Sequence, residues 1–196
     1  MPEILKKLAD LIAFLPGIGD KTAVKLAFFL LKSNTGYLDS LASTIAELKS
    51  TVAECTVCGS LTDRDHAECS ICRDHTRATG TLCIVEDYLD LVAIERLGVH
   101  HGQYHVLGGV ISPLSGKSPA DLRFRSLFER VESENISELI LALNPNIEGE
   151  ATALYIEEYI PRKSVHISRL SKGLPNAGFI EYADEITLLS AFKGRK

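Results

Sequence analysis

Two cysteine pairs, Cys55-Thr56-Val57-Cys58 and Cys69-Ser70-Ile71-Cys72, divide the 196-residue chain into a helical part and an α/β part. Ten residues separate the pairs, so the pattern is C-x2-C-x10-C-x2-C. A two-residue gap lets both sulfurs of one tight turn face the same cation, and two such turns complete a tetrahedron. The spacing therefore predicts a closed structural site for a single Zn²⁺, with Cys55, Cys58, Cys69 and Cys72 as ligands and no open position for catalysis.

Other arrangements of these side chains are two disulfides or four free thiols. Disulfides are rare in reducing compartments, which favours the metal. His66 and His75 lie close enough in the sequence to replace a thiolate, but neither completes a better pattern. The segment 59–68 between the pairs is polar, so we expect metal binding to supply the energy that folds it. The fifth cysteine, Cys83, lies in an apolar run and is predicted to be a small core residue.

Upstream of the cysteines, apolar residues recur with helical spacing over 4–15, and this run stops at Pro16-Gly17-Ile18-Gly19. We expect Asp20 to cap a second helix. The stripe that this second helix should bury consists of Ala23, Leu26, Ala27 and Leu30. A third helix over 38–48 is expected to pack on the first two and to lead into the zinc site.

The turn between the first two helices predicts contact with the backbone of DNA. Gly17 and Gly19 permit a tight turn that exposes backbone N–H groups at a helix N-terminus, where a phosphate oxygen binds favourably. Lys21 and Lys25 are four residues apart and therefore share one helix face. We expect this element to bind DNA through its phosphates. The alternative is a helical hairpin whose lysines are only solvated.

From Thr81 onward, short apolar strands alternate with helices, which predicts a mostly parallel sheet with helices on both faces. The expected strands are 81–85, 104–107, 139–143 and 164–167, and the expected helices are 88–97, 124–131 and 151–159. The predicted fold class is therefore α/β within a multi-domain α+β chain. Its parts are an N-terminal helical hairpin, a small zinc finger and an α/β domain.

Acidic residues follow two of the expected strands, at the edge where such sheets bind ligands. Glu86 follows the first strand, and Glu148 lies shortly after the third. These carboxylates could hold Mg²⁺, or the acids here could cap the following helices, and the residues leave both interpretations open. Ser115-Gly116-Lys117-Ser118 matches the end of a phosphate-binding loop, but Ile111 replaces its first glycine, so no nucleotide site is expected there.

The order of hairpin, four-cysteine site and acid-tipped α/β domain resembles the RecR family of bacterial recombination mediators along essentially the whole chain. The stretches that carry the resemblance are LPGIG at 15–19, YHVLGG at 104–109, NP at 144–145, EGEAT at 148–152, GLP at 173–175 and EYADE at 181–185. The resemblance implies four parts. They are a helix-hairpin-helix domain at 1–54, a zinc finger at 55–78, a Toprim domain at 79–173 and a Walker B-like tail with oligomer contacts at 174–196.

The resemblance also implies a non-enzymatic role. Members of the family act with RecO and RecF to load RecA onto single-stranded DNA coated by single-strand-binding protein. They assemble into ring-shaped oligomers, often tetramers, that can encircle DNA. For this chain we expect a homo-oligomer, a tetramer or a dimer, and binding to single- and double-stranded DNA. By the same resemblance, Lys21 and Lys25 face DNA, whereas Glu86 and Glu148 contact RecO.

Two further hypotheses come from other classes of protein. The first is a Mg²⁺-dependent nuclease or primase-like enzyme. Catalytic Toprim enzymes carry an Asp-x-Asp pair where this chain has Asn144 and Asn146, and amides bind Mg²⁺ more weakly and cannot act as a general base. The second is a zinc-stapled scaffold that binds only proteins.

The net charge of −5, from 21 basic and 26 acidic residues, combines segments of opposite sign. Residues 1–32 hold five lysines and three acids, 129–158 hold eight acids with Arg130 alone, and 160–173 hold four basic residues and no acid. We therefore expect a basic end for DNA and an acidic end for a protein or a metal. No apolar run reaches the about 18 residues of a membrane span, and the N-terminus lacks a signal-peptide pattern. A cytoplasmic, nucleoid-associated protein without membrane contact is predicted.

Overall fold

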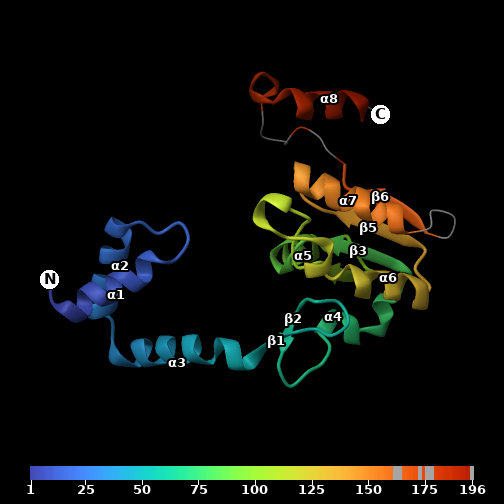
Figure 1. Ribbon diagram of the computed structural model, residues 1–196. Helices are drawn as coiled ribbons and strands as arrows, with labels where there is room; N and C mark the ends of the chain where they lie inside the picture. The colour runs from blue at the N-terminus through green and yellow to red at the C-terminus, as the bar shows by residue number, and fades with distance from the viewer. Residues whose placement is uncertain (161–164, 172–173, 175–178, 195–196) are drawn as a thin grey trace. The chain divides into compact units, whose positions relative to one another are not determined.

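The computed structural model describes residues 1–160, 165–171, 174 and 179–194 (Figure 1). The chain divides into two compact units, Met1–Thr51 and Val52–Lys196, and each is described by itself. Within the described residues, no helix combines the length and the hydrophobicity that crossing a bilayer requires.

The first unit is built on a pair of packed helices, α1 (Glu3–Ala13) and α2 (Asp20–Lys32). Their small core consists of Leu5, Ala9 and Ala27, with Leu8, Ile12 and Val24 packed around it. The N-cap of α2 is Gly19, and no side chain caps this end, so the prediction that Asp20 caps the helix was wrong. Asp20 lies one residue inside the first turn, where its negative charge still favours the helix N-terminus. Leu26 is also not buried as expected, whereas Ala23 is.

The third helix, α3 (Thr35–Thr51), buries none of its residues. Leu38 and Leu41 are half-buried, but Ile45 is 60% exposed and Leu48 is 52% exposed. The predicted packing of this helix on the first two is therefore wrong for its C-terminal half. An apolar stripe predicts that a helix face will be covered, but it does not say which surface covers it.

The second unit begins with a small finger. Its strands β1 (Val52–Glu54) and β2 (Leu61–Asp63) form an antiparallel pair, and α4 (Ser70–Arg73) and the 3₁₀ turn η1 (His75–Arg77) follow. The sequence did not predict the two strands, because three-residue strands carry almost no alternation. The finger leads directly into the first strand of the larger sheet.

The sheet contains four parallel strands in the order β4-β3-β5-β6, which confirms the predicted α/β class. The strands are β3 (Thr81–Val85), β4 (Gln103–Val106), β5 (Glu138–Ala142) and β6 (His166–Arg169). The last strand lies two residues later than predicted, and Ser164 is outside the described residues. Because β3 and β5 occupy the middle of the sheet, their carboxyl ends bring 86 and 144 to one edge.

Helices cover both faces of this sheet. On one face, α6 (Phe124–Ser133) and α7 (Ile147–Tyr159) pack on Leu82, Ile84, Leu139 and Leu141. On the other face, α5 (Tyr88–Glu95) and Ile71 of the finger pack on Cys83, Val85 and Tyr104. Buried Cys83 is therefore the core residue that its apolar surroundings predicted. The chain continues through η4 (Ile180–Tyr182) to α8 (Glu185–Lys193).

Candidate functional site

The finger gathers four buried thiols. The sulfurs of Cys55, Cys58, Cys69 and Cys72 all lie within 4.8 Å of one another. Cys55 and Cys58 come from the turn after β1, whereas Cys69 is the N-cap of α4 and Cys72 lies inside that helix. All five cysteines are unpaired. The Cys58 and Cys69 sulfurs are 3.6 Å apart, well beyond the about 2.05 Å of a disulfide.

Backbone amides point at these sulfurs. The Cys69 amide donates to Cys55 Sγ over 3.3 Å, and the Ser60 amide donates to Cys58 Sγ over 3.4 Å. Hydrogen bonds from the Cys58 and Cys72 thiols lower the pKa of Cys69. Four converging sulfurs with supporting N–H donors fit a tetrahedral, thiophilic cation.

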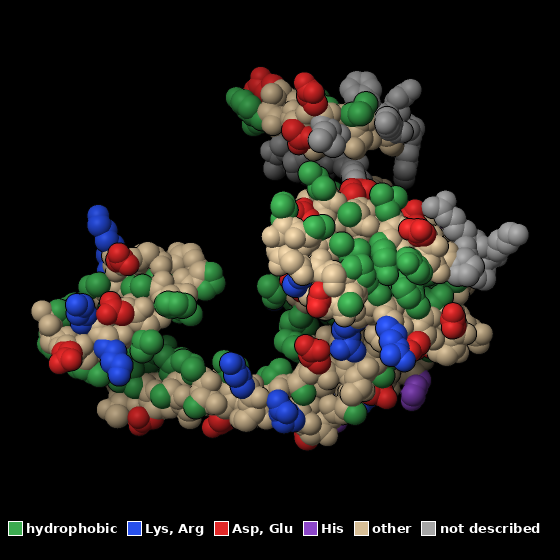
Figure 2. All heavy atoms as spheres, in the orientation of Figure 1, with side chains coloured by type: hydrophobic (Ala, Val, Ile, Leu, Met, Phe, Trp, Pro, Cys, Tyr) green, Lys and Arg blue, Asp and Glu red, His purple; other side chains and the backbone are tan. Residues whose placement is uncertain are grey.

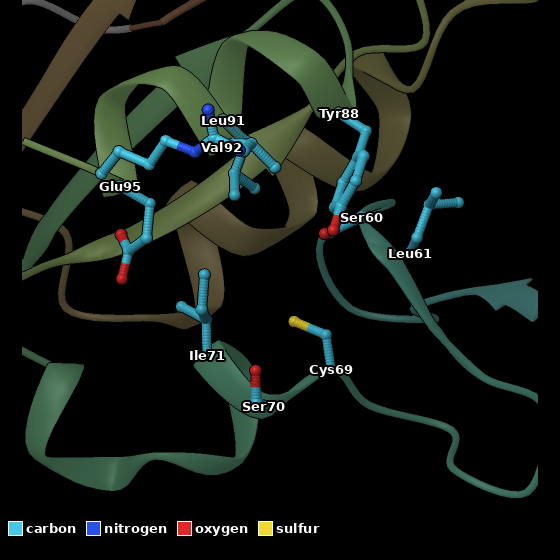
Figure 3. A pocket seen from close by; sticks show the side chains of 10 residues that line it. Ser60, Leu61, Cys69, Ser70, Ile71, Tyr88, Leu91, Val92 and Glu95 are labelled. Atoms are coloured by element: carbon cyan, nitrogen blue, oxygen red, sulfur yellow. The ribbon is translucent and has the colours of Figure 1, made fainter.

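The thiol group is closed to solvent. An open pocket of about 420 Å³ lies between the finger and α5, with Ile71 and Cys69 on one side and Tyr88 and Glu95 on the other (Figure 3). Cys69 is nevertheless only 4% exposed. The nearby His66 contacts Asp65 at 2.9 Å and does not join the thiol group. A cation held by the four sulfurs would therefore have no open position, as expected of a structural site.

The finger is bound to the outer edge of strand β4. The Val106 amide donates to the Cys58 carbonyl over 2.7 Å. Gly59 has φ +77°, and a Cβ there would lie 2.9 Å from the Val106 carbonyl oxygen, so only glycine permits this approach. Arg123 adds bonds of 3.3 Å to the Glu54 carboxylate and 3.4 Å to the Thr56 carbonyl. The loop that carries the predicted metal ligands is therefore hydrogen-bonded to the α/β domain.

The hairpin of the first unit presents a free helix N-terminus. Gly17 has φ +80°, the left-handed conformation that the tight turn requires, and a Cβ at Gly17 or Gly19 would meet no atom within 4 Å. Within the described residues, the amides of Asp20 and Lys21 have no hydrogen-bond acceptor. The side chains of Lys21 and Lys25 are exposed. The geometry leaves two N–H groups and two cations available to an anion.

The structure brings the end of β3 against the loop after β5. Glu86 Oε1 accepts a hydrogen bond of 2.5 Å from the Asn144 amide. Glu148 lies in the first turn of α7 and is half-buried. Among the described residues, the groups of three or more potential ligands are the four cysteines and the Asp63, Asp65 and His66 set, so neither glutamate belongs to such a group.

Side chains of this edge also cap helices, as the alternative to a metal site predicted. Asp87 Oδ1 accepts from the Leu89 amide over 2.8 Å at the start of α5. Asn146 Oδ1 accepts from the Gly149 amide over 2.7 Å at the start of α7. The side chain of Asn146 therefore stabilises the start of α7.

The sequence did not reveal the arginines that hold this domain together. Arg77 donates to both carboxylate oxygens of Glu95 and also to the carbonyls of His100 and Gly102. Arg130 is buried and donates to the Tyr104 carbonyl over 2.9 Å. These contacts join residues about 18 to 26 positions apart, so no local pattern signals them.

Comparisons with known proteins match three regions of the chain. The chain matches the family model of the RecR helix-hairpin-helix at residues 5–49, the Toprim domain at 80–171 and the RecR C-terminal region at 180–196. It is 42% identical over 195 residues to a protein from Natranaerobius thermophilus named Recombination protein RecR. That alignment spans 100% of this chain and 97% of the relative.

The fold and its sites define a Toprim-containing protein with a helix-hairpin-helix element and a four-cysteine finger between them. Identity and coverage over the whole length then make the assignment specific. The chain belongs to the RecR family of recombination proteins.

Proposed function

We propose that this chain is a DNA-binding mediator of recombinational repair that acts without catalysing a reaction itself. In this proposal it works with RecO and RecF to load RecA onto single-stranded DNA coated by single-strand-binding protein. The observation that carries the proposal is the exposed Lys21 and Lys25 pair beside the free amides of the hairpin, in a chain of the RecR family. Phosphate contacts of this kind bind DNA regardless of its sequence, single- or double-stranded.

Binding of fluorescein-labelled oligothymidine and of a duplex tests the DNA face. We expect Lys21→Ala with Lys25→Ala to weaken both by about tenfold and to lower the salt dependence by about two phosphate contacts. Lys6→Ala with Lys7→Ala is the matched control, since it removes the same charge from exposed positions of α1. If both double variants bind equally well, the assigned face is wrong.

The proposed active form is a homo-oligomer, a dimer or a tetramer that closes into a ring. Large apolar side chains of the first unit support it, because a unit with so few buried residues leaves Leu11, Phe14, Phe29 and Leu31 exposed, Phe14 by 92%. Exposed patches of this kind mark contact surfaces. Native mass measurement with and without DNA tests the oligomer, and a monomer under both conditions contradicts it.

We assign one structural Zn²⁺ to Cys55, Cys58, Cys69 and Cys72, because four buried cysteine sulfurs within 4.8 Å of one another suit zinc. The ion would hold the finger in its folded form. We also propose domain boundaries at 1–54, 55–78, 79–173 and 174–196. Lys172, Gly173 and Pro175 lie outside the described residues. Metal analysis of the native protein tests the zinc, and a content well below one ion per chain contradicts it.

We call the carboxyl ends of strands β3 and β5 the Toprim edge. There we propose a contact with RecO through Glu86 and Glu148, while any Mg²⁺ held there would not be catalytic. Asn146 caps α7, and the Asn144 amide donates a hydrogen bond to Glu86, so these side chains already have structural roles. Their structural roles support the proposal that a metal here would not be catalytic. Charge reversal at Glu148 should weaken RecO binding and leave DNA binding unchanged. Cleavage or extension of DNA in Mg²⁺ that Glu148→Gln abolishes would establish an enzyme instead.

A further inference from the structure

A groove lined by aromatic rings lies on the outer side of α6 and α7, and we call it the aromatic groove. Figure 2 shows hydrophobic side chains gathered over these two helices on the visible face of the second unit. The groove is open, with a volume of about 740 Å³. Its rings are Phe124 and Phe128 of α6 with Tyr155 and Tyr159 of α7, and the turn 118–120 forms one wall.

The four rings form a continuous stack. Phe128 lies parallel to Phe124 with centroids 6.0 Å apart and parallel to Tyr159 at 5.7 Å. Tyr155 contacts Phe124 at 4.7 Å and Tyr159 at 4.6 Å. Because each ring is held by its neighbours and by two helices, the surface is formed before any ligand arrives. Binding would therefore cost little ordering of side chains.

Burial within the stack is graded from floor to rim. Phe124 is 3% exposed and forms the floor, Phe128 and Tyr155 are half-buried, and Tyr159 is 58% exposed at the rim. Phe124 belongs to the core beneath the helices with Leu127 and Ile156, and Phe128 and Tyr155 pack against that core, whereas Tyr159 is not part of it. Contiguous exposed aromatic surface of this kind marks an interaction site.

The charges around the aromatic groove indicate which kind of ligand it binds. Arg125 donates to Glu129 over 2.9 Å, and within the described part of the chain Glu132 on the rim has no ion-pair partner. The residues that line the groove thus include two acids, Glu129 and Glu132, and one base, Arg125. The lining therefore carries a net charge of −1, which favours a basic chain over DNA and acidic peptides.

We propose that the aromatic groove binds an extended peptide of a partner protein that carries proline or leucine together with arginine or lysine. Parallel aromatic rings receive the apolar residues of such peptides, and acids at the rim pair with their basic residues. The site is separate from the Toprim edge, since Tyr159 follows Glu148 by eleven residues, about 16 Å along α7. It does not depend on the hairpin lysines.

Selection from a random library tests the proposal. The full-length protein is exposed to displayed 12-residue peptides, and the enriched sequences are synthesised with fluorescein for anisotropy titrations. We expect enriched peptides with a net positive charge and with proline or leucine. Tyr159→Ser and Glu132→Lys should each weaken them at least tenfold, and Tyr159→Phe should retain binding. Tyr37→Ser and Glu47→Lys, exposed matched changes on α3, should have less than a twofold effect.

Several outcomes would overturn the proposal. They are enrichment of acidic peptides, failure to enrich any peptide that Tyr159→Ser weakens, and equal binding by the groove and control variants. Loss of oligothymidine binding in Tyr159→Ser without peptide binding would assign the rings to nucleic acid. A reduced mass of the same variant in sedimentation would assign them to a second copy of the chain. Since Glu132 is exposed, Glu132→Lys tests the proposal even if Tyr159→Ser does not fold.

Discussion

Lowering the pH from 7.5 to 5.5 should destabilise the second unit through the buried imidazole of His105. This side chain is 0% exposed on β4, and its Nε2 lies 3.0 Å from the carbonyl oxygen of Arg123. A carbonyl only accepts, so Nε2 carries the proton, and Nδ1 has no partner among the described residues. Burial lowers the pKa of His105 to about 3, and the positive charges of Arg130 and Arg123 act in the same direction.

The magnitude follows from the difference between the folded and unfolded pKa. The unfolded chain takes up the proton near pH 6.5, whereas the folded protein resists it down to about pH 3. The contribution to stability is therefore complete above pH 6.5 and is lost as the pH falls, by about 1.36 kcal/mol per unit. At pH 5.5 the loss amounts to about 1.4 kcal/mol relative to pH 7.5.

Urea unfolding of the wild type and of His105→Gln at both pH values isolates this effect. Glutamine has an amide that can donate to the Arg123 carbonyl, but it does not titrate. We expect the wild type to lose about 1.4 kcal/mol more than the variant over this interval. Zinc content is measured at both pH values, to verify that the thiols of the wild type and of the variant hold the same amount of metal. Identical pH dependence, or an imidazole that titrates near pH 6.5 in the folded protein by NMR, would refute the reasoning.

Three other perturbations test the packing of the second unit. Gly149→Ala should destabilise it by about 2 to 3 kcal/mol in urea unfolding, because the new Cβ would lie 2.0 Å from the Asn144 carbonyl oxygen. A cost below about 0.5 kcal/mol would mean that the loop yields freely. Arg77→Met should cost about 2 kcal/mol, since a partly buried glutamate loses its partner, whereas Arg125→Met at an exposed pair should cost under about 0.5 kcal/mol. Equal costs would contradict this. Thiol titration should detect four reactive cysteines after chelation and Cys83 only in denaturant, since burial raises its pKa to about 12. Early reaction of a fifth thiol would place Cys83 outside the core.

The sequence predicted the α/β domain well because its strands are buried on both faces and therefore read as continuous apolar runs. It placed the start of α7 four residues too late. The segment 147–150 looks like an acidic loop after Pro145, yet Asn146 caps it and acids favour a first helical turn. Periodicity finds the middle of a helix, whereas its ends depend on single hydrogen bonds.

The sites differ in how far apart their residues lie along the sequence, and this decides how well each could be predicted. The four cysteines lie within eighteen residues and their spacing alone implies a shared cation, so the thiol group could be predicted without a fold. The contact between Glu86 and the Asn144 amide joins residues 58 positions apart, and it follows only from the pairing of β3 with β5. The aromatic groove was equally hidden, because Phe128 and Tyr159 read as ordinary core positions of two separate helices.

The finger also covers part of the open edge of the sheet. Strand β4 is an edge strand, and an edge with free N–H and C=O groups invites pairing with another chain. The Val106 amide is bonded to Cys58 and the Tyr104 carbonyl to Arg130, so one outward group is covered by the metal-binding turn and another by a buried arginine. A disordered finger would withdraw the first of these partners. Metal binding by the four thiols would therefore also support the edge strand of the α/β domain. This contact gives a structural reason for the order of the parts along the chain.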